Sequence, residues 1–281
     1  MAALFRNGLV SVSFRKETPE AIIRYACGAG LECIEWGADV HCPPDQPARL
    51  KEVSRLTEEA GLETSSYGTY FRLGASWDLE RFKRVCEAAK LLKAPVVRIW
   101  GGEKGSEAIG AAEWEQLVSQ ARETVSYAGS QELYVTLECH PNTVTDSYES
   151  SLKFIKECAP ESSGTSGASA TSGSSGTCGT DRLWMYWQPN QFKSPEYNLD
   201  AARLLAPYTV NLHVFNWSAS ERFPLAKGTD RWMAYLAEFR LGLKTSGDCW
   251  NRPRSMELEF MYDDRPESLK SEAETLRLLN K

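Results

Sequence analysis

The chain contains three histidines, and each of them follows a short apolar run. They are His41, His140 and His213, in the segments GADVHC, TLECHP and VNLHVFNW. Each lies at or just beyond the end of a segment with the composition of a β-strand. One histidine at such a position is usually structural, whereas three at equivalent positions indicate a shared site. Imidazole there could bind a metal ion or carry a proton.

Charged residues are expected inside the same strands. Alternate residues of a barrel strand face the lumen, so the apolar Val135 and Leu137 predict that Glu138 points inward. The same alternation predicts inward positions for Glu35, Arg98, Thr136, Gln188, Asn211, His213, Glu257 and Glu259. A buried carboxylate without a partner is very unfavourable, so it must pair, take up a proton or bind a cation. Arg98 could neutralise one of Glu35, Glu138 and Glu259, but not all three.

A divalent metal ion would satisfy the remaining carboxylates. Oxygen ligands with one imidazole suit Mn, Mg, Co or Zn, and ligand type alone does not choose among them. An internal network of salt bridges without a metal is the structural alternative. Glu257 lies one layer deeper than Glu259, and its only expected role is to pair with a polar neighbour.

Eight apolar runs alternate with helical patterns along the 281 residues. The expected strands are residues 9–14, 32–36, 64–67, 95–100, 133–138, 183–187, 210–215 and 256–260, with helical periodicity clearest over 19–29, 47–60, 79–92 and 114–128. This alternation predicts parallel strands, and eight units predict one (β/α)8 TIM barrel domain over residues 1–281. An open doubly wound sheet is less suitable, because RKET rather than a glycine fingerprint follows the first strand.

Residues 161–180 interrupt this alternation, since 18 of the 20 positions are Ser, Gly, Thr or Ala. Such a segment cannot bury enough apolar surface to offset the entropy of ordering it, which predicts a flexible loop. It falls between the fifth helix and the sixth strand, on the barrel face opposite the usual active site. We interpret it as a tolerated insertion, with a partner-binding role as the alternative.

Composition excludes several classes of protein. Hydrophobic residues make up 42% and charged residues 25% of the chain, as in ordinary globular proteins. A net charge of −6 argues against a nucleic-acid partner. The apolar runs are too short to span a membrane, and residues 1–12 do not resemble a signal peptide. The eight cysteines form no CxxC pair and are expected to be reduced thiols. We therefore expect a cytoplasmic enzyme, and a homo-oligomer is compatible with the sequence.

The sequence resembles the xylose-isomerase-like superfamily of TIM barrels, the sugar phosphate isomerase/epimerase group, over nearly its whole length. The segments that carry the resemblance are IEWGADVH, SYGTYFRLG, VRIWGG, LECHPNTVTDS, YWQPN, NLHVFNW and LEFMYDDRPE. The resemblance implies a metal ion held by Glu, Asp, His and Glu from strands five to eight. The matching positions in this chain are Glu138, Gln188, His213 and Glu259.

Gln188 departs from this pattern, because a carboxylate is common at its position. The amide oxygen of Gln188 could still coordinate a cation, but the site loses one negative charge. Metal affinity should then be weaker, or Gln188 should hydrogen-bond the substrate instead. Asn190 is a candidate replacement ligand.

The resemblance implies a divalent-metal-dependent sugar isomerase or epimerase. The metal would polarise a carbonyl, and Glu138 and Glu259 would move the proton through an enediolate. The partner would be a small sugar or polyol, and the residues expected to contact it are Glu35, Trp36, His41, Arg98, His140, Asn142, Trp217 and Arg222. Tyr70 and Trp100 could add aromatic walls, and Lys227 could join Arg222 in binding a phosphate or carboxylate.

Three other functions are compatible with such a barrel to different degrees. A metal-dependent dehydratase of a cyclic polyol or keto-sugar would use the same metal and carboxylates to eliminate water. A non-catalytic sugar-binding barrel would explain Gln188, and metal content would distinguish it from the enzymes. A DNA-repair endonuclease on this scaffold is disfavoured, because it needs many histidines and a basic groove.

Overall fold

The computed structural model describes residues 4–159, 183–248 and 250–281. The expected insertion at 161–180 lies outside the described residues. No helix within the described ranges combines the length and apolar composition that crossing a membrane requires.

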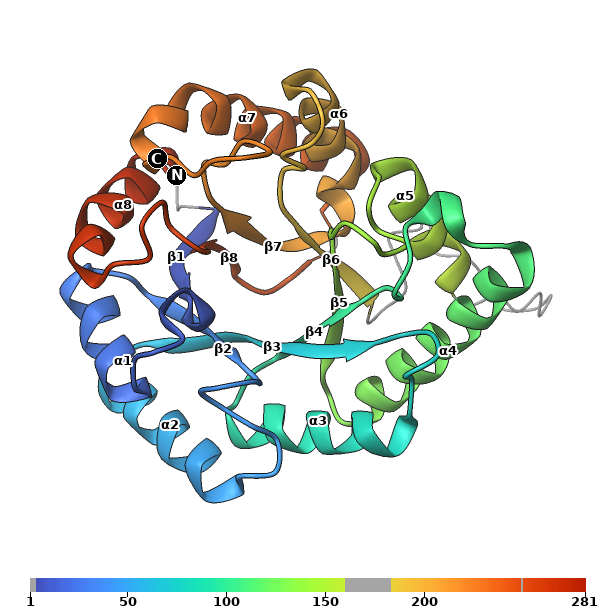
Figure 1. Ribbon diagram of the computed structural model, residues 1–281, viewed down its shortest axis with the longest axis horizontal. Coiled ribbons are helices and arrows are strands. Elements are labelled where there is room, and N and C mark those ends of the chain that lie inside the picture. The colour runs from blue at the N-terminus through green and yellow to red at the C-terminus, as the bar shows by residue number, and fades with distance from the viewer. Residues whose placement is uncertain (1–3, 160–182, 249) are drawn as a thin grey trace, which may run out of the picture.

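Eight parallel strands close into a barrel in chain order, with β1 pairing with β8 (Figure 1). The strands are β1 (Phe5–Val10), β2 (Cys33–Gly37), β3 (Glu63–Arg72), β4 (Val96–Trp100), β5 (Tyr134–Glu138), β6 (Leu183–Trp187), β7 (Thr209–Val214) and β8 (Arg254–Leu258). The helices that surround them are α1 (Pro19–Gly28), α2 (Pro47–Glu59), α3 (Leu79–Leu91), α4 (Ala111–Ser130), α5 (Tyr148–Cys158), α6 (Pro195–Leu205), α7 (Thr229–Ser246) and α8 (Pro266–Leu279). The expected single-domain (β/α)8 barrel is confirmed.

Side-chain caps fix where several helices begin. Thr18 accepts a hydrogen bond from the amide of Ala21 at the start of α1, and Asp78 does the same for the first turn of α3. Ser147 and Ser194 cap α5 and α6. Each cap satisfies an amide that the helix itself leaves unpaired, so each helix starts at a set distance from its strand.

The first strand differs from its expected range of 9–14. It ends at Val10, and Ser11–Phe14 forms a short 3₁₀ helix, η1. The serine hydroxyls explain the change, because Ser11 accepts a hydrogen bond from the amide of Gly37 and Ser13 accepts one from the amide of Phe260. These bonds tie η1, which follows β1, to the last residue of β2 and to the loop after β8.

The core has two parts. Apolar side chains fill the layer between strands and helices, with Ile22 of α1 and Leu50 of α2 fully buried. The lower lumen contains a smaller apolar cluster, which includes Val96, Trp184 and Trp250. The upper lumen is polar. This arrangement leaves the carboxyl ends of the strands for the charged groups.

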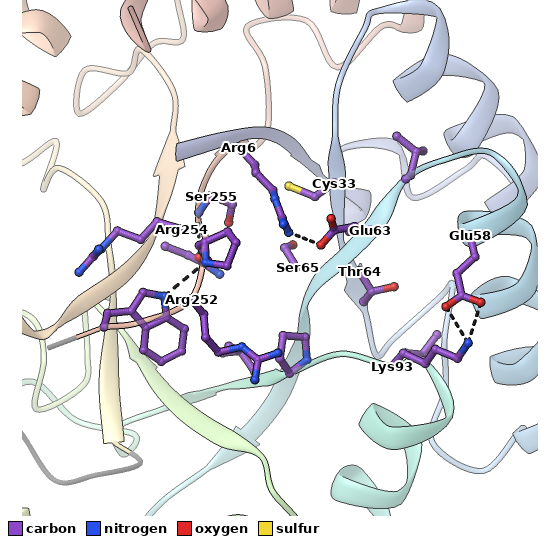
Figure 2. A pocket seen from close by; sticks show the side chains of 17 residues that line it. Arg6, Cys33, Glu58, Glu63, Thr64, Ser65, Lys93, Arg252, Arg254 and Ser255 are labelled. Carbon is purple, nitrogen blue, oxygen red and sulfur yellow. Dashed lines mark hydrogen bonds and ion pairs between the residues drawn. The ribbon is translucent and has the colours of Figure 1, made fainter. Parts of the chain in front are cut away.

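A cavity of about 300 Å³ lies at the amino ends of the strands (Figure 2). Arg6 pairs there with Glu63, and the Lys93 ammonium lies 2.7 Å from the Glu58 carboxylate. These charges neutralise one another. No cluster of histidine with carboxylates lines this cavity within the described ranges, so the chemistry is expected at the other end of the barrel.

Candidate active site

His213 of β7 is the centre of the polar upper lumen and is fully buried. Its Nδ1 atom lies 3.0 Å from Oε1 of Gln188, which follows β6 directly. The same nitrogen lies 3.3 Å from a carboxylate oxygen of Glu259 and 3.6 Å from one of Glu138. The four ligand positions implied by the resemblance, on or just after β5 to β8, therefore meet around one imidazole nitrogen.

This donor set fits a divalent cation. One ligand atom each from Glu138, His213 and Glu259 lie within 4.8 Å of one another, and all three residues are buried. Two carboxylates held this close in a buried site repel each other unless a positive charge lies between them. Two carboxylates, an amide oxygen and an imidazole are ligands that Mg, Mn, Co and Zn accept.

Glu138 is held as a carboxylate by two strong donors. Arg98 pairs with it, and the indole nitrogen of Trp100 donates a hydrogen bond to it over 2.6 Å. Burial alone would raise the pKa of Glu138, but the positive charges of Arg98 and His213 outweigh burial and lower it. Glu138 therefore keeps its negative charge throughout the physiological pH range.

Glu259 has a different environment. Burial raises the pKa of its carboxyl to about 7, and the neighbouring charge of Glu138 contributes. Within the described chain, His213 is the sole ion-pair partner of the Glu259 carboxylate. Burial opposes a charge on His213 as well, but the surrounding carboxylates, Glu259 foremost, raise the imidazole pKa well above its usual value. The two glutamates beside His213 thus have pKa values that are shifted in opposite directions. Such pairs commonly divide acid and base roles in enzymes.

Glu35 and Glu257 form a deeper layer beneath these ligands. Arg98 and Ser66 both bond to Glu35, and Oε1 of Glu35 lies 3.5 Å from Nε2 of His213. Burial would raise the pKa of Glu35, but Arg98 lowers it to about 2. Glu35 does not line the upper cavity, so its expected contact with substrate is not supported.

Glu257 belongs to the same layer, and its expected pairing with polar neighbours is confirmed. It accepts hydrogen bonds from Tyr186 and Ser255. Burial raises the pKa of Glu257 to about 7. Glu35, His213 and Glu257 also place ligand atoms within 4.8 Å of one another, but both oxygens of Glu257 accept hydrogen bonds below the cavity, so we assign Glu257 to support of the barrel interior.

A cavity of about 330 Å³ opens above the ligands at the carboxyl ends of the strands. Of the expected substrate-binding residues, Arg98, His140, Trp217 and Arg222 line it, together with Tyr70 and Trp100. The imidazole of His140 stacks on Trp100 with ring centroids 4.4 Å apart, and Nδ1 of His140 lies 2.7 Å from the Pro141 carbonyl oxygen. The cavity thus combines flat aromatic walls with charged groups, as small-molecule sites usually do.

Three expected contacts with substrate lie elsewhere. Trp36 is fully buried in the core, because Glu35 points into the lumen and the next residue must point toward the helices. His41 is also buried, and its Nδ1 lies 3.1 Å from the Ser11 hydroxyl. Asn142 is exposed in the loop after β5 and does not line the cavity.

Asn190, a candidate metal ligand, and Lys227, a candidate anion-binding residue, do not line the cavity either. The amide of Asn190 bonds to the backbone of Phe192 and Asp146, so it is committed to loop structure and not to a metal. Lys227 lies exposed in η4 (Leu225–Gly228), outside the cavity wall.

Sequence reasoning missed Arg15 and Phe260, which both line the cavity. The expected first strand ends at residue 14, with Arg15 at the start of the following loop. In the structure residues 11–14 form η1, and Arg15 follows it directly. Phe260 was placed on the helix side by strict alternation, but β8 ends at Leu258 and Phe260 adopts a positive φ of 42°. The loop geometry that turns its ring toward the cavity has no signal in the apolar pattern.

Comparison with known proteins agrees with this architecture. Residues 23–164, about half of the chain, match the family described as "Xylose isomerase-like TIM barrel". A 3-dehydroshikimate dehydratase from Bacillus anthracis is 28% identical over an alignment of 161 residues that covers 54% of this chain. That match spans 57% of the relative's own length.

Two solved structures share the whole fold. The probable 3-DHS dehydratase involved in petrobactin synthesis from Bacillus anthracis has a TM-score of 0.71 at 19% identity, covering 97% of this chain and 98% of that one. A xylose isomerase-like TIM barrel protein from Mycobacterium smegmatis, in complex with magnesium, has a TM-score of 0.65 at 11% identity and covers both chains fully. From the family match and the barrel, the chain belongs to the xylose isomerase-like TIM barrel family.

Proposed function

We propose that the chain is a divalent-metal-dependent dehydratase of a cyclic hydroxy ketone, the class of compound to which 3-dehydroshikimate belongs. The observation that carries the proposal is the set of Glu138, His213 and Glu259 beside the cavity. The similarity to a 3-dehydroshikimate dehydratase supports elimination of water rather than isomerisation or epimerisation. All three reactions begin with removal of a proton next to a carbonyl group.

Glu138, Gln188, His213 and Glu259 would hold the metal ion. A divalent cation there would polarise the ring ketone and make the neighbouring C–H group more acidic. The magnesium complex of the Mycobacterium smegmatis protein supports the choice of a divalent cation. These ligand types suit several divalent cations, among them Mg, Mn, Co and Zn.

Glu259 is proposed as the base that takes the proton from the carbon beside the ketone. Its carboxylate lines the cavity and contacts only His213 among the described ion-pair partners. Glu138 is occupied by Arg98 and Trp100, which suits a fixed ligand better than a proton carrier. The hydrogen bonds thus support a division of labour between two glutamates that the sequence had given the same role.

His140 is proposed to help the hydroxyl group leave. Its ring lies in the cavity wall, and the contact of Nδ1 with the Pro141 carbonyl leaves Nε2 free to serve the substrate. As Glu259 removes the proton, the electron pair of that C–H bond forms the new double bond. The C–O bond of the next carbon breaks, and the hydroxide leaves as water after taking the Nε2 proton of His140, which must enter this step as an imidazolium because Nδ1–H donates to Pro141. With 3-dehydroshikimate, a further proton shift would give the aromatic compound 3,4-dihydroxybenzoate.

Product analysis in D2O tests this reaction against its alternatives. The metal-loaded protein is incubated with 3-dehydroshikimate, and separately with ketoses, aldoses and inososes, and each mixture is followed by NMR. Loss of water from 3-dehydroshikimate or an inosose supports the dehydratase. Interconversion of ketoses with deuterium incorporation, and no loss of water from any cyclic ketone, would indicate an isomerase or epimerase instead.

A further inference from the structure

Two arginines, Arg15 and Arg222, lie near one aromatic ring, that of Phe260, at the wall of the upper cavity. The guanidinium carbon of Arg15 is 5.8 Å from the ring of Tyr70 and 5.9 Å from that of Phe260. The guanidinium carbon of Arg222 lies 5.4 Å from the Phe260 ring and 5.0 Å from Trp217. Both arginines line the cavity that contains Glu138 and Glu259. Neither arginine is needed to hold the metal.

Each guanidinium is held from outside the cavity. Arg15 pairs with Asp39 and bonds to the Tyr70 hydroxyl, whereas Nη1 of Arg222 donates to Asp264 over 2.6 Å. Asp39 and Asp264 do not line the cavity, so each fixes its arginine from behind. In the described chain the hydrogen bonds of Arg222 involve Nη1 alone, which leaves Nε and Nη2 for a ligand. An arginine fork held this way is suited to a planar anion.

The backbone at Phe260 is strained in a way that holds this arrangement. Its φ of 42° lies in the left-handed region, which a bulky side chain rarely adopts. The amide of Phe260 donates to the Ser13 hydroxyl over 2.9 Å, and its carbonyl accepts from the indole of Trp217 over 3.0 Å. Strained conformations that two bonds maintain are concentrated at ligand sites. Here the strained residue places its ring within 5.9 Å of both guanidinium carbons.

We infer that Arg15 and Arg222 bind a carboxylate group on the substrate, so that the substrate class is a cyclic hydroxy ketone bearing one carboxylate. The inference rests on the proposed function and makes it more specific. The ketone would face the buried ligand set, the ring would lie between the aromatic walls, and the carboxylate would reach the mouth of the cavity. A neutral sugar could accept hydrogen bonds from these guanidinium groups, but it has no negative charge to pair with them.

The inference is tested by binding rather than turnover. Isothermal calorimetry compares 3,4-dihydroxybenzoate with its neutral analogue 3,4-dihydroxybenzamide, which presents the same two hydroxyls to the metal. We expect the acid to bind the metal-loaded protein roughly 10- to 100-fold more tightly, since hydrogen bonds to a charged group contribute about 1.5–3 kcal/mol. Arg15→Gln and Arg222→Gln should each remove most of this preference and leave amide binding unchanged. Arg240→Gln, on the exposed side of α7, is the matched control and should retain it.

Several results would overturn the inference. Equal affinity for acid and amide would do so, as would absence of binding by both. Equal weakening of both ligands in the arginine variants would show that the arginines are structural. Inorganic phosphate that competes as strongly as the carboxylate would move the assignment to a phosphate group. The proposed function fails separately: selective binding of the acid without dehydration of 3-dehydroshikimate removes the reaction and keeps the carboxylate site.

Discussion

Oε1 of Gln188 lies 3.0 Å from Nδ1 of His213, at the position where the resemblance to the family implies a carboxylate. Gln188→Asp should therefore tighten Mn²⁺ binding by roughly tenfold or more, because a nearby opposite charge contributes more than about 1.4 kcal/mol at moderate dielectric. Titration of the metal-free protein measures the dissociation constant. The matched control is Gln191→Asp, which adds the same charge to the same cavity. Equal tightening in both variants would mean that Gln188 has no specific contact with the metal.

Glu259→Gln should lower the catalytic rate about 10²- to 10⁴-fold, the range expected for loss of a general base. The amide keeps a coordinating oxygen, so excess metal should not restore the rate. Glu257→Gln is the control, since residue 257 lies on the same face two residues deeper and does not line the cavity. Full rescue of Glu259→Gln by added metal would reduce Glu259 to a ligand.

Glu138→Gln should behave differently from Glu259→Gln. It replaces a ligand carboxylate with an amide, as Glu259→Gln does, but it also leaves Arg98 with one partner fewer and its charge unbalanced beside the metal. We expect weaker metal binding, with part of the lost activity returning at high metal concentration. Activity measured across a metal titration distinguishes the two variants. Identical titration curves for both would contradict the division of roles between these glutamates.

Metal affinity should increase with pH between 6 and 8. Without metal, the pKa of Glu259 is raised to about 7 and that of His213 is raised well above its usual value. A ligand must lose its proton before it can bind a cation, so binding releases protons and becomes easier as the pH rises. Calorimetry in buffers of different ionisation enthalpy counts the protons released. An affinity that does not change over this range would contradict the assigned ligands.

Glu257 should make the metal-free protein less stable as the pH rises toward 8. The pKa of its carboxyl is about 7 in the folded chain against 4.5 as the ordinary value. A raised pKa stabilises the fold fully below the unfolded value, and this contribution is lost as the pH rises through 7. Glu257→Gln should therefore reduce the slope of unfolding free energy against pH by up to about 1.4 kcal/mol per pH unit between pH 5 and 7.

Urea unfolding at several pH values, with a chelator present, measures that slope. Glu274→Gln, on the exposed side of α8, is the control and should leave it unchanged. An unaltered slope in Glu257→Gln would show that this carboxyl does not take up a proton on folding.

The sequence predicted the strand order and the inward-facing polar residues because both depend on short-range alternation, whereas the proposed ligand set came from the resemblance to the family. Glu138 and His213 point inward for the same reason that Val135 and Val214 point outward, and parallel strands bring their ends together. The same rule, applied fully, would have excluded Trp36 as soon as Glu35 was placed in the lumen. Alternation fails where a strand ends, which is why the orientation of Phe260 could not be predicted.

The mouth of the cavity could not be read from the sequence either. Arg15 and Arg222 come from the loops after β1 and β7, and hydrogen bonds between distant residues set their positions. Such contacts form only when the barrel closes, so the local pattern of apolar and polar residues does not predict them. Only the general rule that barrel sites lie at the carboxyl ends of strands pointed to this region.

The most direct test of the central claim is the metal dependence of 3-dehydroshikimate dehydration. The protein is treated with a chelator, supplied with 3-dehydroshikimate, and then given Mn²⁺ or Mg²⁺, while the ultraviolet absorbance of the aromatic product is recorded. We expect no product before the metal is added and steady formation of 3,4-dihydroxybenzoate afterwards. The same rate with and without metal would contradict the role given to Glu138, His213 and Glu259, and no product under either condition would contradict the proposed reaction.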